Sequence, residues 1–174
     1  MSAQPYPAYA FVPGFGPHPT RDPEGHSFGK VEPRALPLDF DKWDECDTYL
    51  RGIDLFNAGY YWEAHEAWEN VWNALGREGL EALLLKGLIK LAAVGIKIRQ
   101  HYTQAGQSLA KQAAGHFRDI GEERNDVLCA GLNLRDLVLW CEQLSRDIEN
   151  LVGDPTKKVE IVFAQQLKTQ APLS

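Results

Sequence analysis

The stretch GIDLFNAGYYWEAHEAWENVW, residues 52 to 72, contains the end of one predicted helix, a turn and the start of another. Asn57, Ala58 and Gly59 interrupt the apolar spacing, and glycine suits the left-handed conformation that ends many helices. Apolar residues recur at three- and four-residue spacing on both sides of this turn. We therefore predict two helices joined by a short loop, which pack as antiparallel neighbours.

The helical pattern starts near Asp41, and Asp39 or Asp41 is the predicted N-cap of the first of these two helices. The sequence that follows them predicts three more helices of the same kind. Gly121 is expected to close the fourth helix, and Asn133 with Asp136 resembles a capping box that opens the fifth. The predicted helices span residues 41–57, 60–75, 77–100, 103–120 and 133–151. The predicted fold class is all-α: a single-domain bundle of about five antiparallel helices over residues 41–152.

Both ends of the chain are expected to lie outside this bundle. Residues 1–40 hold eight of the ten prolines and four glycines, which prevents a helix. They also carry aromatic residues that a purely solvated tail has little reason to keep, namely Tyr6, Tyr9, Phe11, Phe15 and Phe28. We predict an extended, proline-rich N-terminal arm that lies on the helices through these side chains. Residues 153–174 form a C-terminal tail, in which residues 159–163 suit either a short strand or a docked segment.

Charge and composition limit the partners and the compartment. Lysine and arginine number 18 against 24 acidic residues, so no basic excess is available to neutralise a nucleic-acid backbone. No run of about 18 apolar residues occurs, and the N-terminus lacks the pattern of a secretory signal. We predict a cytoplasmic protein with neither a nucleic-acid nor a membrane partner. Cys46, Cys129 and Cys141 lack metal-ligand spacing and are expected to be reduced core residues.

One flank of the second predicted helix carries the residue types that can do chemistry. At about 100° per residue, His65 and Glu69 share this flank, Glu66 lies further round and Glu63 points elsewhere. A carboxylate beside an imidazole stabilises its charged form or fixes its tautomer. Trp68 falls on the apolar stripe, whereas two other tryptophans border the flank. The candidate ligand-binding residues are Trp62, His65, Glu66, Glu69, Trp72 and, from the next helix, Lys86.

Three interpretations of this cluster stay open. In the first, the polar pair is hydrogen-bonded at a helix seam and the aromatic residues serve packing or dimerisation. In the second, the cluster lines a cleft in a small-ligand-binding or accessory protein. In the third, His65 with Glu66 or Glu69 holds a divalent metal ion that activates water in a hydrolase. Whether the chain is an enzyme, and whether it forms a homodimer, are left open.

The metal interpretation has extra support from the arm. The segment PHPTRDPEGHS, residues 17 to 27, offers two histidines and two carboxylates that would fold back over the second helix. HExxH and the paired ExxH motifs of di-iron bundles are absent from the sequence. The candidate metal ligands are His65, Glu66, Glu69, His18 and His26, and a divalent ion is the one cofactor that the sequence suggests.

Basic residues on the third predicted helix form a second candidate feature. Lys86, Lys90 and Lys97 share one face, with Arg99 nearby, which suits a small anion-binding face or simply a solvated stripe. His116 has no close sequence partner and is expected to be structural.

The opening stretch, followed by LKGLIKLAAV at residues 85–94, resembles the signature of the family called domain of unknown function 309 (DUF309). This resemblance covers roughly residues 48 to 110. It implies a small all-helical bundle whose characteristic polar residues correspond to Glu63, His65, Glu66 and Glu69, and it implies no reaction. The sequence departs from the family pattern at Lys90, where glutamine is usual, and near Lys97, where a histidine is frequent.

Overall fold

The computed structural model describes residues 4–171, so residues 1–3 of the predicted arm and 172–174 of the predicted tail lie outside it. Within the described residues five α-helices form, together with two short 3-10 helices and one two-stranded hairpin. The helices are α1 (Asp47–Asn57), α2 (Tyr61–Ala74), α3 (Leu80–Arg99), α4 (Thr103–Arg124) and α5 (Leu134–Asp147). Strands β1 (Leu128–Cys129) and β2 (Leu132–Asn133) pair antiparallel. The predicted, predominantly helical fold is confirmed.

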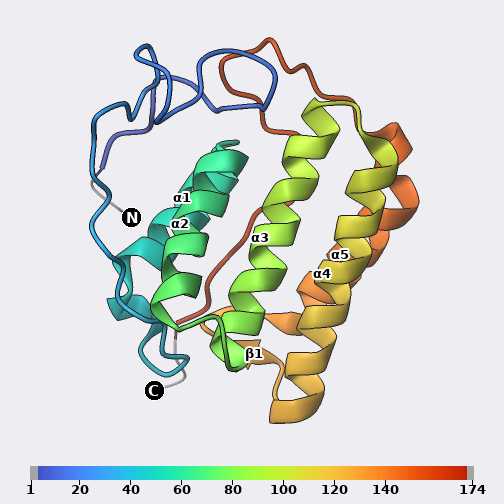
Figure 1. Cartoon of the computed structure of the whole chain (residues 1–174). Coiled ribbons are helices and arrows are strands. Elements are labelled where there is room, and N and C mark those ends of the chain that lie inside the picture. The colour runs from blue at the N-terminus through green and yellow to red at the C-terminus, as the bar shows by residue number, and fades with distance from the viewer. Residues whose placement is uncertain (1–3, 172–174) are drawn as a thin grey trace.

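Helix α3 is the centre of the molecule (Figure 1). Helices α1 and α2 lie on one side of it, and α4 and α5 lie on the other. Two glycines of α3 allow these close approaches. A Cβ atom at Gly95 would lie 2.6 Å from the ring of Tyr61 in α2, and one at Gly87 would lie 2.5 Å from the ring of Phe117 in α4.

The turn between α1 and α2 has the predicted form. Gly59 has a φ of 90°, the left-handed conformation expected there. On α2 the apolar stripe faces inward, because Ala64, Trp68 and Val71 are completely buried. The indole Nε1 of Trp68 donates a hydrogen bond to the carbonyl of Tyr49 in α1 at 3.2 Å. Trp68 therefore belongs to the core.

Some predicted helix boundaries are wrong. Asp39 and Asp41 cap no helix, since α1 begins after Cys46 and follows a short 3-10 turn at Trp43–Glu45. Gly121 lies inside α4, which continues to Arg124 and ends at the left-handed Asn125. The predicted cap of α5 is confirmed, because the Asn133 side chain accepts a hydrogen bond from the backbone N–H of Asp136 at 3.1 Å.

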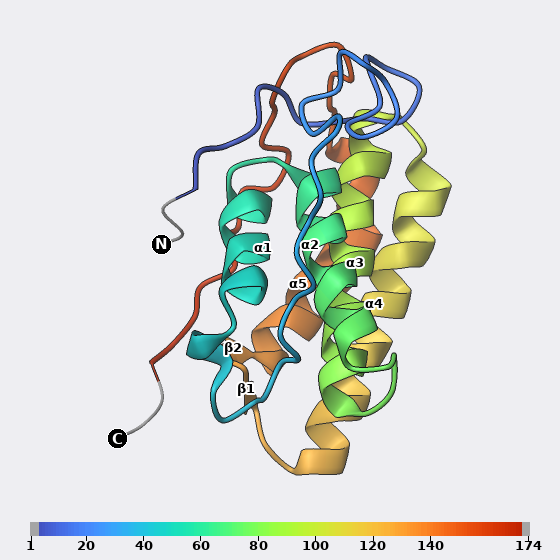
Figure 2. The ribbon, with the colours of Figure 1, turned by 60° about the vertical axis from the view of Figure 1, so that its left-hand side comes forward.

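The N-terminal segment, residues 4–40, contains no helix and only an isolated bridge between Val12 and Phe15. Figure 2 shows it running along α2, where the Asn70 side chain accepts a bond from Ala35 N–H and donates one to the Pro33 carbonyl. Residues 159–163 form no strand. Instead, Phe163 is buried against the rings of Phe56 in α1, Tyr61 in α2 and Trp140 in α5.

Two remaining expectations concern the cysteines and the membrane. The three cysteines are buried and free, and burial raises the pKa of the Cys141 thiol to about 12. None of the helices in the described part of the chain has the length and apolar character needed to span a bilayer.

Candidate functional site

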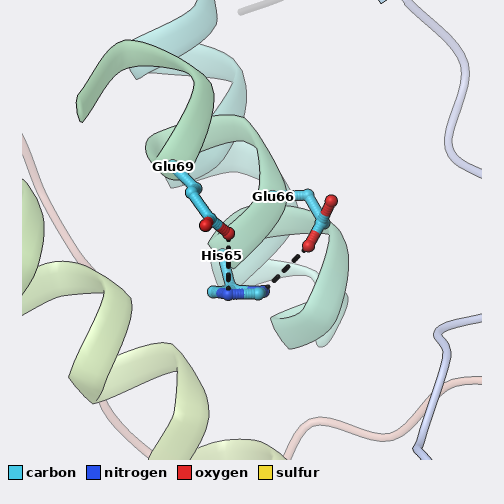
Figure 3. Close-up of side chains that lie close together, drawn as sticks. All are labelled: His65, Glu66 and Glu69. Atoms are coloured by element: carbon cyan, nitrogen blue, oxygen red, sulfur yellow. Dashed lines mark ion pairs between the residues drawn. The ribbon is translucent and has the colours of Figure 1, made fainter. Parts of the chain in front are cut away.

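His65, Glu66 and Glu69 come together on α2, as the helical spacing predicts (Figure 3). The Nε2 atom of His65 lies 3.2 Å from Oε2 of Glu69, and its Nδ1 atom lies 3.4 Å from Oε1 of Glu66. The imidazole thus lies between two carboxylates, one beside each ring nitrogen. Its side chain is 22% exposed, whereas those of Glu66 and Glu69 are 54% and 39% exposed. The cluster is therefore open to solvent on its carboxylate side.

The three side chains can present their ligand atoms to one point. One nitrogen of His65 and one oxygen from each carboxylate all lie within 4.8 Å of one another. Nδ1 of His65 is inaccessible to solvent and has no hydrogen-bond partner of good geometry. A buried ring nitrogen in this state gains from a bound ion or a reoriented carboxylate.

Electrostatics make Glu66 the unusual carboxyl of the group. Its pKa is raised chiefly by burial, and the negative charges of Glu69, Glu63 and Glu32 raise it further. His65 acts in the opposite direction and lowers it. The raised pKa of Glu66 thus reflects burial together with three carboxylates that one imidazole does not offset.

Aromatic rings close one side of the cluster. The ring of Trp62 lies 5.2 Å from that of His65 and also contacts Phe11 at 5.0 Å and His18 at 5.9 Å, centroid to centroid. Trp62, which the cleft interpretation places in a wall, thus packs against the N-terminal segment. Trp72, the other tryptophan of that interpretation, carries the guanidinium of Arg77 over its ring at 4.8 Å.

Glu63 and His26 form a second polar pair that helix geometry alone did not reveal. Their side chains are only 7% and 6% exposed, and Nε2 of His26 lies 2.9 Å from Oε1 of Glu63. The same oxygen accepts the backbone N–H of Phe11 at 2.9 Å. His26 therefore reaches α2 but meets Glu63 rather than His65. The sequence feature that could have indicated this pair is Glu63 itself, a glutamate on the face of α2 that the predicted arm covers.

The other predicted residues lie apart from this group. Neither His18 nor His26 belongs to the set of ligand atoms around His65. Lys86 is exposed on α3, and after burial its positive charge is the next cause that lowers the pKa of Lys90 and of His116. Arg99 does not share a surface with these lysines, because it is 1% exposed.

Two hollows occur away from α2. A hollow of about 200 Å³ is lined by Ile98, His101, Thr103, Ile148, Glu149, Leu151 and Val152. A larger one of about 750 Å³ lies between α5 and residues 161–170. Neither is lined by His65, Glu66 or Glu69, so these carboxylates meet solvent at the surface rather than in either hollow.

Comparison with known proteins identifies the region that holds the cluster. Residues 49–109 match the model of the family described as a domain of unknown function (DUF309), which confirms the resemblance predicted for that region. No curated protein matches the chain. The matched region includes α2 and α3 entirely, and with them His65, Glu66 and Glu69.

Proposed function

We propose that the DUF309 region of this chain binds one divalent metal ion through His65, Glu66 and Glu69. The observation that supports this function is the convergence of one imidazole nitrogen and two carboxylate oxygens within 4.8 Å. All three side chains come from a single stretch of α2, so the helix itself holds their spacing. Mixed nitrogen and oxygen ligands suit Zn²⁺, Mn²⁺ and Fe²⁺.

The two ring nitrogens of His65 would take different roles. A neutral imidazole offers one nitrogen to a metal while the other carries its proton. Nε2 of His65 lies beside Glu69, so this nitrogen and the Glu69 carboxylate would be two ligands of the same ion. Glu66 stands beside Nδ1, where it can accept that proton in a hydrogen bond and hold the ring in its metal-binding tautomer. A shift of the Glu66 side chain would instead make it the third ligand.

An ion held in this way keeps coordination positions open to solvent. Structural zinc sites have four protein ligands, whereas an ion with three or fewer retains water or another ligand. The partly exposed carboxylates leave that side of the cluster accessible. The small ligand expected from the sequence would therefore bind to the ion through an oxygen or nitrogen donor, and the tryptophans would form no cage for it.

Calorimetric titration of the full chain tests this function. The protein is purified without a metal-affinity step, treated with a chelator and titrated separately with Zn²⁺, Mn²⁺ and Fe²⁺. We expect one ion per chain in the wild type and no binding in His65→Ala. Glu66→Gln should bind about 10- to 100-fold more weakly, as for other groups that orient a ligating histidine.

A matched control is Glu122→Gln, which removes an exposed carboxylate from α4. This variant should bind the ion as the wild type does. Wild-type protein that takes up none of the three ions would refute the function. So would uptake that His65→Ala leaves unchanged.

A metal-dependent hydrolase is the second candidate, favoured by the position of Glu66 beside the pair of His65 and Glu69. A carboxylate next to a bound ion can take a proton from a metal-bound water. In this form His65 and Glu69 would hold the ion, and Glu66 would act as general base. Chromogenic carboxylic and phosphate esters provide the test. Glu66→Gln should then lose turnover by about 100-fold or more while still binding the ion.

A further inference from the structure

A second cluster of nitrogen groups lies where α3 packs against α4. Lys86 and Lys90 are four residues apart on α3, and Gln112 and His116 are four residues apart on α4. The Nζ atom of Lys90 donates a hydrogen bond to Oε1 of Gln112 at 2.7 Å, which joins the two helices. Both lysines act electrostatically on His116. The four residues therefore form one group across the helix pair.

The positive charge of this group is not neutralised. Lys86 and Lys90 take part in none of the ion pairs found among residues 4–171. The Lys90 ammonium has three N–H donors, and its bond to Gln112 uses one of them. Like charges four residues apart on a helix repel each other. An anion placed between them would remove this repulsion and accept the remaining donors.

His116 supplies an independent observation. Its Nε2 atom is inaccessible to solvent and has no hydrogen-bond partner in the described part of the chain. The pKa of His116 is lowered, first by burial and then by Lys86 and Lys90, while Asp119 raises it. Lowering the pKa keeps the imidazole neutral, so it has one N–H to donate. Buried polar atoms normally have a partner, and here the partner is missing.

We propose that Lys86, Lys90 and His116 bind a phosphate group, either free phosphate or a phosphomonoester, with Gln112 holding Lys90 in place. Two ammonium groups match the double negative charge of the phosphate, and its several acceptor oxygens serve the donors of all three side chains. This site is separate from the metal cluster on α2, and the proposal does not rest on metal binding.

NMR of chelator-treated full-length protein tests the site with inorganic phosphate as the probe. The ring resonances of His116 should shift and saturate as phosphate is added at constant ionic strength, with chloride as the replaced anion. Lys86→Gln and Lys90→Gln should each weaken the apparent affinity about tenfold, and the double variant should show no saturation. Glycerol phosphate in a parallel titration distinguishes a phosphomonoester site from one that takes free phosphate alone.

Lys97→Gln is the matched control, because Lys97 also lies on α3 but bonds to Gln100 and covers the ring of Tyr102. It should leave phosphate binding unchanged. Thermal melts of each variant establish that it folds. The proposal is overturned if His116 does not respond saturably to phosphate, or if the response survives in the double lysine variant.

Discussion

Glu66 shows how the surroundings of a single residue can change its pKa. Burial and three nearby carboxylates raise its pKa, and the one imidazole beside it does not compensate. Its proton is therefore bound more tightly in the folded chain than in the unfolded chain. A group of this kind destabilises the fold once it ionises.

We predict that Glu66→Gln raises the melting temperature at pH 7 in metal-free protein. The expected rise in melting temperature follows from the raised pKa of Glu66, because glutamine does not ionise. Below the ordinary glutamate pKa of 4.5 the carboxyl is protonated in both states, and the two proteins should have equal stability. The difference should develop as the pH rises through the interval between 4.5 and the higher folded pKa. Melting curves from pH 3 to pH 8 measure it, and a variant less stable than wild type at pH 7 would contradict the prediction.

His26 and Glu63 are the residues whose pairing holds the N-terminal segment on α2. Both side chains are buried, and removing the imidazole leaves the carboxylate with the Phe11 N–H as its remaining described hydrogen-bond donor. We predict that His26→Ala lowers the free energy of unfolding by about 1–3 kcal/mol, the usual cost of leaving a buried polar group short of a partner.

Urea denaturation measures this loss, and limited proteolysis locates it. Cleavage in residues 4–40 should become faster in His26→Ala while the helices stay protected. Glu24→Ala is the matched control in the same segment, because Glu24 is exposed. If the two substitutions lowered the free energy of unfolding equally, the pair of His26 with Glu63 would contribute no specific stability.

At the scale of single residues, the sequence predicted contacts within a helix well and contacts between distant segments poorly. His65 and Glu69 are four residues apart, so helix geometry alone brings them together. His26 and Glu63 are 37 residues apart, and the intervening chain is irregular. No periodic pattern determines where such a chain lies, so the histidine could be expected near α2 but not assigned to one glutamate.

Among the elements, α3 depends on glycine where it meets its neighbours. A Cβ atom at Gly87 would lie 2.5 Å from the ring of the fully buried Phe117. Alanine favours a helix over glycine by about 1 kcal/mol, but overpacking a core costs about 1–3 kcal/mol. We predict that Gly87→Ala lowers the free energy of unfolding by about 1–2 kcal/mol, measured by urea denaturation.

Gly115 on α4 is the matched control, since a Cβ atom there meets nothing within 4 Å. Gly115→Ala should stabilise the protein by about 0.5–1 kcal/mol through helix propensity alone. A stabilising Gly87→Ala would mean that α3 and α4 can separate slightly without cost.

Element boundaries were predictable only where a local interaction sets them. Asn133 caps α5 with its own side chain, so residue type was sufficient. Gly121 resembled a stop, yet α4 runs through it because a helix can include glycine at modest cost. The hairpin of β1 and β2 has two residues in each strand, too few to produce an alternating pattern. Its turn is visible instead in the positive φ angles of Ala130 and Gly131.

For the molecule as a whole, Arg99 joins three separate parts of the chain. From the end of α3 its guanidinium donates to the carbonyl of Ala10 near the N-terminus and to those of Asp154 and Lys157 near the C-terminus. Its Nε atom also lies 3.6 Å from a carboxylate oxygen of Glu160. Sequence reasoning grouped Arg99 with the surface lysines, because nothing within α3 shows that both ends of the chain cover it.

We predict that Arg99→Ala loosens both terminal segments together. The guanidinium is 1% exposed, so its loss leaves three carbonyls without their donor and removes one of the two cations beside Glu160. Breaking a buried, charge-assisted network costs about 3 kcal/mol in the free energy of unfolding. Urea denaturation measures that loss, and limited proteolysis should show new cleavage in residues 4–40 and in residues 153–171 at the same time.

Arg118→Ala is the control that distinguishes the loss of a buried arginine from the loss of an exposed one. Arg118 forms a shorter ion pair, 2.6 Å to Glu142, but both side chains are substantially exposed. Solvent screens such a pair, so its loss should cost less than about 1 kcal/mol and expose neither terminus to protease. If Arg99→Ala opened one terminal segment while the other stayed protected, the two ends would be held independently. The backbone bond from Ala10 N–H to the Lys158 carbonyl at 2.7 Å, which joins the ends directly, leads us to expect that they open as one unit.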